Sequence, residues 1–314
     1  MESVLQVIFS AVFVSTILRV STPLILPALG GLIAELGGVP NIALEGMMLT
    51  AACAGVLVSA YTQSEWLGLL AGVLLAEIMA LILGFFHLNL KADIILVGLA
   101  LNILASGATI FVVYLLTGDK GSSSKLVSLQ MPTVDIPFIK DIPVLGEILS
   151  GQNLLTYVAF IATGLVWLFL YRTRPGIHVR AVGENPDAAR SVGINVTAMR
   201  YLALLMSGFL AALGGIHLSM GYVKFFQRDM TAGRGFIALA AVYLGAKHPV
   251  GTLIAAVVFG AADALSIQLG NLKIPSQLVQ MIPYVVTVAS LILYAVVRKR
   301  QAAARQRKFQ QASL

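Results

Sequence analysis

Charged residues are scarce in this chain of 314 residues: they make up 11% of it, whereas a soluble domain usually has about a quarter. Hydrophobic residues make up 58%, and the longest polar stretches have only about thirty residues. A water-soluble domain has no place in such a chain. The composition therefore predicts an all-α, polytopic membrane protein, with a single transmembrane domain over residues 1–314.

Cysteine, metal-ligand clusters and phosphate-binding loops are also lacking. The one cysteine, Cys53, lies in an apolar run, so an intrachain disulfide is impossible and a redox role is disfavoured. The four histidines have no ligand spacing, which argues against a metal site. No G-x-x-x-x-G-K-[ST] stretch is present, and the serines at 122–124 have no base beside them. We therefore predict no catalytic residue and no ATP hydrolysis by this chain.

Apolar runs predict about ten transmembrane helices. The runs lie near residues 3–18, 21–36, 43–60, 66–86, 94–117, 154–171, 201–223, 235–246, 250–269 and 276–297. Ten crossings put both the N- and the C-terminus in the cytosol. The second run contains Pro23 and Pro27, which favour a kinked or broken helix. The eighth run has twelve residues, about 18 Å as a helix, and is too short to cross alone.

Three polar segments connect or follow these runs. Residues 172–200 carry five arginines against two acidic residues, which places them in the cytosol by the positive-inside bias. Residues 118–153, slightly acidic and rich in serine and proline, predict an irregular external loop, and a plain connection is favoured there over a receptor-docking surface. Six basic residues between Arg298 and Lys308 predict a cytoplasmic tail, 298–314, that faces anionic membrane lipid and not nucleic acid.

The segment 172–200 carries the signals of a short helix of its own. Asn185 can cap it, Pro186 suits its first position, and Asp187 is favoured by the dipole at its N-terminus. Gly193 is available to end it. These signals leave two interpretations, an ordinary capped turn or a helix on which a cytosolic partner pushes.

Three stretches carry a family resemblance. They are GENPDAARSVGI at residues 183–194, MRYLALLMSGFLAALGGI after it, and GLIAELGGVPNIALEGMML near the N-terminus. The chain resembles, over nearly its whole length, permease subunits of bacterial ATP-binding-cassette (ABC) importers of the ribose-type (simple-sugar) superfamily. It is most similar to the nucleoside-uptake branch, which is served by lipoprotein receptors of the basic-membrane-protein type. The resemblance implies a multi-pass permease of the bacterial cell (inner) membrane that forms the translocation path for nucleosides.

The resemblance also implies the partners of such a permease. ATP and Mg would bind to an ABC ATPase subunit, and a substrate-binding lipoprotein and a paralogous permease chain, or a second copy of this one, would complete the importer. The short cytoplasmic helix would be the coupling helix that docks on the ATPase. Its residues would be Glu184, Asn185, Pro186, Asp187, Ala188, Ala189 and Arg190.

Polar side chains inside apolar runs are costly, so each is a candidate for the translocation path, a gate or a contact within the bundle. Asn41 can cap the third span, and Glu45 would then lie one turn inside it. Glu45 is either a carboxylate in the field of its own helix N-terminus or part of a gate. Asn102 either bonds between helices or meets a solute hydroxyl.

Two further acidic residues lie within apolar runs. Glu77 is midway along the fourth run, where a charge needs a partner or a proton, and the sequence names no partner. Asp263 lies among small residues. It either pairs with Arg234 or Lys273, or lines the path.

The segment 221–235 mixes aromatic and basic residues. Phe225 and Phe226 are candidates to stack on nucleobases, although the same mixture is typical of an aromatic belt at the membrane surface. The predicted topology puts the three basic residues of this segment outside, against the positive-inside bias. Either the span count is wrong nearby, or these charges have a function that overrides the bias; the second is favoured.

Three other functions are weighed against a nucleoside permease. An ABC permease for a simple sugar such as ribose shares the superfamily motifs. A proton-coupled secondary transporter would use Glu45, Glu77 and Asp263 as titrating groups. A membrane enzyme or scaffold would need polar clusters that the sequence does not contain. The motif at 183–194 favours the ATP-driven permease.

Overall fold

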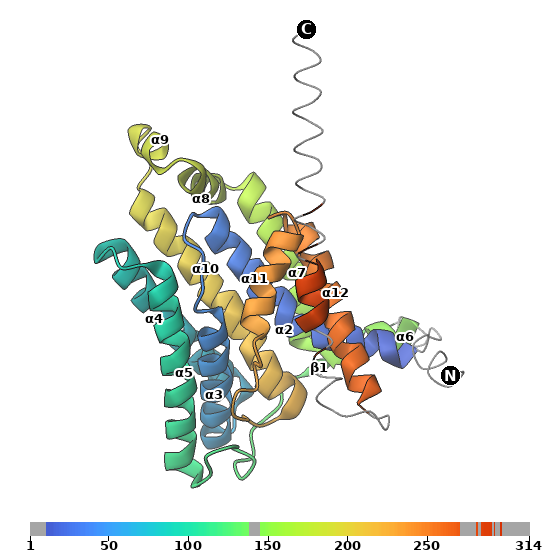
Figure 1. The fold of residues 1–314 in the computed structure, drawn as a ribbon. Helices are drawn as coiled ribbons and strands as arrows, with labels where there is room; N and C mark the ends of the chain where they lie inside the picture. The colour runs from blue at the N-terminus through green and yellow to red at the C-terminus, as the bar shows by residue number, and fades with distance from the viewer. Residues whose placement is uncertain are drawn as a thin grey trace.

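The computed structural model describes residues 11–137, 145–270, 281, 284–290, 292 and 296, without the side chains of Leu145 and Tyr222. Within them, seven helices are long and apolar enough to cross a membrane (Figure 1). They are α2 (Ala11–Leu36), α3 (Leu44–Thr62), α4 (Glu65–Gly84), α5 (Ile94–Thr117), α7 (Leu154–Arg172), α10 (Val196–Ile216) and α12 (Pro249–Leu269). The predicted span 276–297 lies mostly, and the tail 298–314 wholly, outside the described residues.

Shorter elements connect these helices. They are the π-helical turns η1 (Phe85–Asn89) and η2 (His217–Val223), the helices α6 (Leu145–Leu149), α8 (Arg174–Glu184), α9 (Pro186–Ser191) and α11 (Arg234–Leu244), and the strands β1 (Thr133–Val134) and β2 (Gln152–Asn153). The two strands pair antiparallel within the 118–153 connection. Apart from this small ribbon the described elements are helical, as predicted.

The predicted spans 3–18 and 21–36 are not two separate crossings, because residues 11–36 form the single helix α2. Pro23 cannot donate to the carbonyl oxygen of Arg19, one turn before it. The Nε2 atom of His217, in η2, lies 3.2 Å from that oxygen and supplies the missing donor. The helix therefore continues through the proline, as membrane helices can when a neighbour satisfies the freed backbone.

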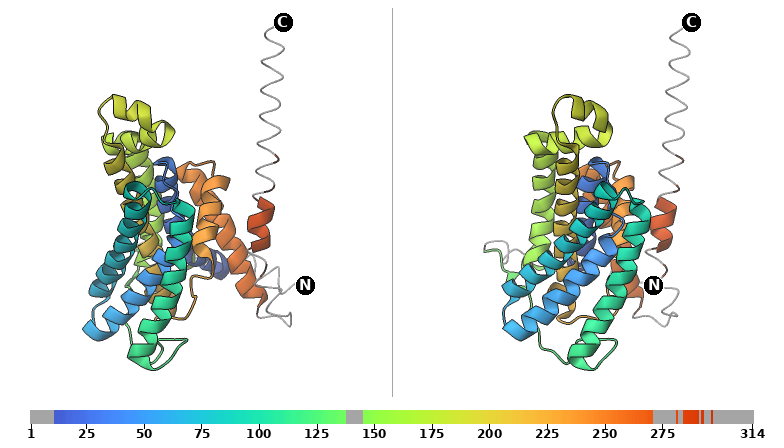
Figure 2. Two further views of the ribbon diagram at one scale, coloured as in Figure 1. Left: turned by 60° about the vertical axis from the view of Figure 1, so that its left-hand side comes forward. Right: turned by 90° about the vertical axis from the view of Figure 1, so that its left-hand side faces the viewer.

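The bundle has two distinct ends (Figures 1 and 2). Helices α8 and α9 stand together at one end, here called the α9 end. The connection between α5 and α7 lies at the other, here called the loop end. Because Ser15 near the start of α2 accepts a hydrogen bond from Gln152 of β2 at 2.7 Å, α2 begins at the loop end. It finishes beside α8, so residues 11–36 make one crossing where two were predicted.

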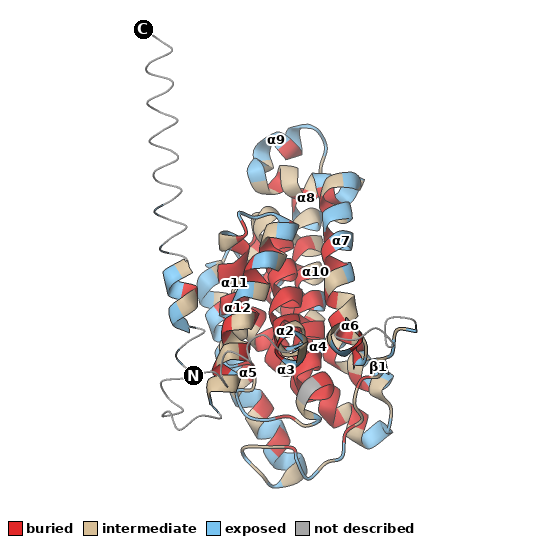
Figure 3. Cartoon of the chain, turned by 90° about the vertical axis from the view of Figure 1, so that its right-hand side faces the viewer, coloured by how far each residue is buried: buried red, intermediate tan, exposed pale blue. Residues whose placement is uncertain are grey.

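The core lies along α2 and α10 (Figure 3). In the most apolar stretch of α10, 78% of the residues are buried, against 22% in that of α5, so α10 is central and α5 peripheral. Small residues allow the central helices to approach closely. At Gly215 a Cβ atom would collide with the carbonyl oxygen of Met48 on α3, so only glycine fits there.

We predict that Gly215→Ala destabilises the protein by about 1–3 kcal/mol, because the added methyl group forces α10 away from α3. The measurement is the thermal unfolding midpoint in detergent. Gly164→Ala on α7 is the matched control, since a Cβ there meets nothing within 4 Å and the helix gains from losing a glycine. Equal midpoints for the two variants would contradict the close packing of α10 on α3.

Candidate functional site

Helix α9 confirms the short helix predicted from cap signals. The Oδ1 atom of Asn185 accepts hydrogen bonds from the backbone N–H groups of Asp187 at 3.2 Å and Ala188 at 3.0 Å. Pro186 occupies the first position, and Gly193 follows the helix with a φ of +85°. The preceding helix, α8, was not predicted, although Thr173 is its N-cap and a proline follows in its first turn.

The surface of α9 is open to a partner. Five of the seven predicted coupling residues are exposed: Glu184, Asn185, Asp187, Ala188 and Arg190. Pro186 is half-buried, and Ala189 points inward, where it packs with Val182 and Val196. One exposed apolar side chain, Val192, was not predicted; it is 74% exposed beside the helix and adds contact area.

Helix α8 seats this surface on the bundle. A Cβ atom at Gly183 would collide with the carbonyl oxygen of Leu36, the last residue of α2. Gly38 has a φ of +74°, and a Cβ on it would stand 3.1 Å from the Cα atom of Gly183. The end of α8 therefore lies directly against the end of α2 and the start of residues 37–43, here called the 37–43 segment.

The 37–43 segment leads from the α9 end into the bundle without forming a helix. The buried side chain of Asn41 donates to Ser207 Oγ on α10 at 2.9 Å and accepts from the backbone of Ala43 at 3.0 Å. From α5, Asn102 donates to the carbonyl oxygen of Ile42 at 2.9 Å and accepts from the N–H of Gly46 at 2.8 Å. Both asparagines thus satisfy irregular backbone in the membrane interior.

Glu45 joins two helices at the end of this segment. Its carboxylate accepts hydrogen bonds from the backbone N–H groups of Gly233 and Gly235, each at 2.7 Å. These groups are at the N-terminus of α11, so Glu45 caps α11 while it stands in the first turn of α3. The sequence offered the field of its own helix or a gate, and it could not name α11, because the approach of α11 is a tertiary contact.

Asp263 forms the ion pair with Arg234 that the sequence offered as one alternative. Arg234 Nη2 and Asp263 Oδ2 are 2.7 Å apart, and both side chains are 19% exposed. The pair borders a cavity of about 210 Å³, and Tyr284 at its rim donates to the carbonyl oxygen of Ala232 at 2.8 Å. Lys273, the other candidate partner, lies outside the described residues.

The remaining candidates, Phe225, Phe226 and Glu77, do not take part in these contacts. Phe226 is 1% exposed in the core, and its backbone N–H donates to Ser123 Oγ at 2.8 Å. This bond holds the chain with its ring turned inward, away from an interfacial belt, and its part in the path stays a prediction. Phe225 is half-buried. Glu77 is half-buried too, and its Oε2 atom has no hydrogen-bond partner among the described residues.

These features belong together in one kind of protein. An exposed helix at one end is joined, through α8 and the 37–43 segment, to the hydrogen-bonded side chains of Asn41, Asn102 and Glu45 inside a bundle of membrane helices. Such an arrangement defines the class of multi-pass membrane transport permeases. Among the described residues no group of three or more His, Cys, Asp or Glu side chains is placed to hold a metal ion.

The sequence comparisons define the family within this class. The family model described as "Branched-chain amino acid transport system / permease component" matches residues 13–291. The chain belongs to this family of ABC transporter permease subunits, which are not enzymes.

Individual relatives are similar over almost the whole chain. The guanosine ABC transporter permease protein NupQ of Bacillus subtilis is 39% identical, over 90% of this chain and 91% of its own length. The nucleoside ABC transporter permease protein NupC of Lactococcus lactis is 34% identical, over 90% and 92%. TsgC13 of Haloferax volcanii, provisionally named a glucose ABC transporter permease protein, is 32% identical, over 92% and 93%.

One solved structure shares the fold. It is an inward-facing ABC transporter provisionally assigned to the metal-chelate type, with a TM-score of 0.52 and 16% identity. The match covers 89% of this chain and 84% of the other. At this identity the likeness supports the architecture alone.

We predict that Glu45→Ala lowers the free energy of unfolding by roughly 2–4 kcal/mol, because two backbone N–H groups at the start of α11 lose a charged acceptor. The midpoint of thermal unfolding in detergent reports the change. Glu65→Ala removes the same group from the first turn of α4 and serves as the control, with a shift below about 1 kcal/mol. A Glu45 variant as stable as this control would exclude the capping role.

Proposed function

We propose that this chain is the permease subunit of an ATP-driven importer and forms the translocation path for nucleosides. The observation that carries the proposal is the exposed helix α9, seated through Gly183 on the end of α2 and the 37–43 segment. A helix so placed can pass a push from a soluble partner into the bundle. The likeness to permeases named for guanosine and nucleosides supports the solute class.

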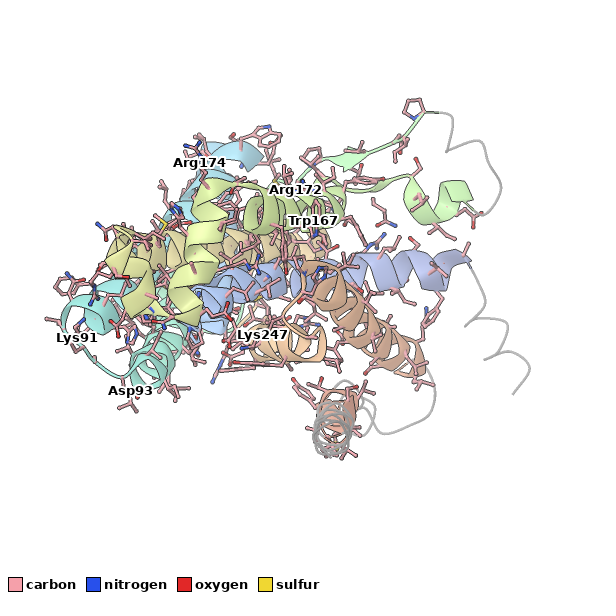
Figure 4. The ribbon with its side chains drawn as sticks, turned by 90° about the horizontal axis from the view of Figure 1, so that it is seen from above. Lys91, Asp93, Trp167, Arg172, Arg174 and Lys247 are labelled. Atoms are coloured by element: carbon pink, nitrogen blue, oxygen red, sulfur yellow. The ribbon has the colours of Figure 1, made fainter. Side chains whose placement is uncertain are left out.

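We propose that the α9 end is cytoplasmic. Figure 4 looks onto this end, where four basic residues lie around the helix termini: Lys91, Arg172, Arg174 and Lys247. This distribution agrees with the positive-inside bias. The single permease domain, 1–314, then has the loop 118–153 outside and the coupling loop 172–200 and the lipid-facing tail 298–314 in the cytosol. Of the ten predicted crossings, the separate one at 3–18 is withdrawn, so Ala11 of α2 begins outside.

The mechanism we propose starts on the partner ATPase, which binds ATP and Mg. Its closure moves α9, whose docking residues are Glu184 to Arg190. The movement passes from Gly183 to Leu36 and the 37–43 segment, and then to Glu45 and the start of α11. Because packed helices shift as rigid bodies, the path opens alternately to either side. In this mechanism Asn41, Asn102 and Asp263 keep the moving segments bonded to their neighbouring helices.

A second permease chain completes the path in this proposal. Only 22% of the most apolar stretch of α5 is buried, so α5 offers a long face to a neighbour. We propose that a paralogous permease, or a second copy of this chain, covers part of it and membrane lipid another part. A substrate-binding lipoprotein delivers the solute at the loop end.

Two alternatives make different demands on the same residues. A sugar permease is supported by the likeness to TsgC13, at a lower identity than to NupQ. A proton-coupled transporter needs free titrating groups, whereas Glu45 is bonded to two backbone N–H groups and Asp263 to Arg234. The Oε2 atom of Glu77 has no hydrogen-bond partner among the described residues.

We expect cells that lack this chain to lose uptake of labelled guanosine and uridine that excess unlabelled ribose does not inhibit. The assay uses a strain without other nucleoside carriers, and the restored gene is the control. Depletion of ATP should abolish the uptake, whereas an uncoupler applied while ATP is maintained should not. Ribose-sensitive uptake would move the solute to sugars, and uncoupler sensitivity at constant ATP would exclude the ATP-driven mechanism.

We predict that the double replacement Pro186→Gly and Asp187→Gly reduces uptake at least about tenfold. The first turn of α9 is then no longer preset, so α9 no longer transmits the movement of the ATPase to the membrane helices. The level of the permease in the membrane should not change. The double replacement Ser124→Gly and Val127→Gly, at exposed positions in the connection at the loop end, is the matched control. Normal uptake by the α9 variant would remove the docking assignment.

A further inference from the structure

An exposed ion pair lies beside the middle of α5. Arg228 Nε and Asp229 Oδ2 are 3.2 Å apart, and their side chains are 62% and 55% exposed. The hydroxyl of Ser106 donates to the other carboxylate oxygen, Asp229 Oδ1, at 3.1 Å. Ser106 is the thirteenth residue of α5, which has 24, so the carboxylate stands beside the midpoint of a membrane-spanning helix.

The backbone holds this carboxylate in place. The N–H of Arg228 donates to the carbonyl oxygen of Gly121 at 2.8 Å, and the buried ring of Phe226 anchors the turn just before it. Asp229 has a φ of +51°, a left-handed conformation that, apart from glycine, mainly asparagine and aspartate adopt. Its carbonyl oxygen accepts from Ala232 at 2.9 Å. Two separate segments thus fix an exposed acidic group, which is typical of a functional position.

The depth of the pair decides what faces it. Charged side chains at mid-membrane depth are costly and rare. Those that occur face the interior of the bundle or a water-filled cavity, and not the acyl chains. Arg228 and Asp229 are more than half exposed, so this chain does not bury them. The face between α5 and residues 228–229 is therefore in contact with water. This also accounts for Arg228, one of the three basic residues that oppose the positive-inside bias.

We propose that Asp229, positioned by Arg228 and Ser106, is a solute-contacting residue of the translocation path and accepts hydrogen bonds from the vicinal hydroxyls of a ribose. A carboxylate only accepts, and its two oxygens can take two neighbouring hydroxyl donors. Acidic side chains bind ribose hydroxyls in the same way in dinucleotide-binding folds. This inference rests on the proposed nucleoside function and names the part of the solute that is recognised.

The test uses a thiol in place of the Ser106 hydroxyl, within the assembled transporter. We expect Ser106→Cys to react with a hydrophilic, membrane-impermeant methanethiosulfonate, and guanosine to slow the reaction about tenfold. The same concentration of 2′,3′-dideoxyguanosine, which lacks both hydroxyls, should not slow it. Adding Asp229→Asn should remove the protection by guanosine. The native Cys53 is buried, and Ile161→Cys, 62% exposed midway along α7, is the lipid-facing control that should not react.

Uptake gives an independent measurement if Ser106→Cys does not assemble. Asp229→Asn alone should reduce guanosine uptake about tenfold at an unchanged membrane level, whereas Glu65→Gln should not. A transporter that takes up guanosine, but whose Ser106→Cys thiol is unreactive or equally protected by the dideoxynucleoside, overturns this inference and leaves the proposed function intact. Unchanged uptake by Asp229→Asn overturns it too. No uptake of guanosine by the unaltered transporter would instead remove the proposed function.

Discussion

Backbone hydrogen bonding inside a membrane is the constraint on which the rest of this structure depends. Every N–H and carbonyl group that leaves a helix within lipid needs a partner from the protein. The chain leaves helical geometry at the 37–43 segment and again before α11, and it loses a donor at Pro23. Asn41, Asn102, Glu45 and His217 supply the missing partners. The polar side chains of the interior are therefore first of all the supports of irregular backbone.

In the proposed mechanism the same supports form the joint that moves. A continuous helix transmits displacement along its axis, whereas the 37–43 segment joins α2 and α8 at one end to α3 and α11 at the other. We propose that this connection directs a displacement of α9 to the middle of the membrane. Glycines at both contacts, Gly183 and Gly235, allow main chains to touch. In the proposed mechanism, the contact by which Glu45 caps α11 is also the contact that carries the movement.

The bundle divides its polar groups between two environments. Glu45, Asn41 and Asn102 are bonded to protein atoms within the helix packing, and the Arg234–Asp263 pair is largely buried. Arg228 and Asp229 stand exposed at a similar depth. A permease needs both kinds, because one set keeps irregular segments folded and the other offers hydrogen bonds to a solute that has left bulk water.

The sequence by itself determined the membrane class, most helix positions and the α9 helix, because hydrophobic runs and cap signals act over a few neighbouring residues. It also indicated that Glu45, Asn102 and Asp263 have special roles, since polar groups in apolar runs require partners. Only the tertiary structure decided which partners these are, that Phe226 is buried, and that α2 passes through Pro23 unbroken. Each of these depends on contacts between residues far apart in the chain, such as Arg19 with His217 and Glu45 with Gly233, and no local pattern encodes which distant backbone group a side chain will meet.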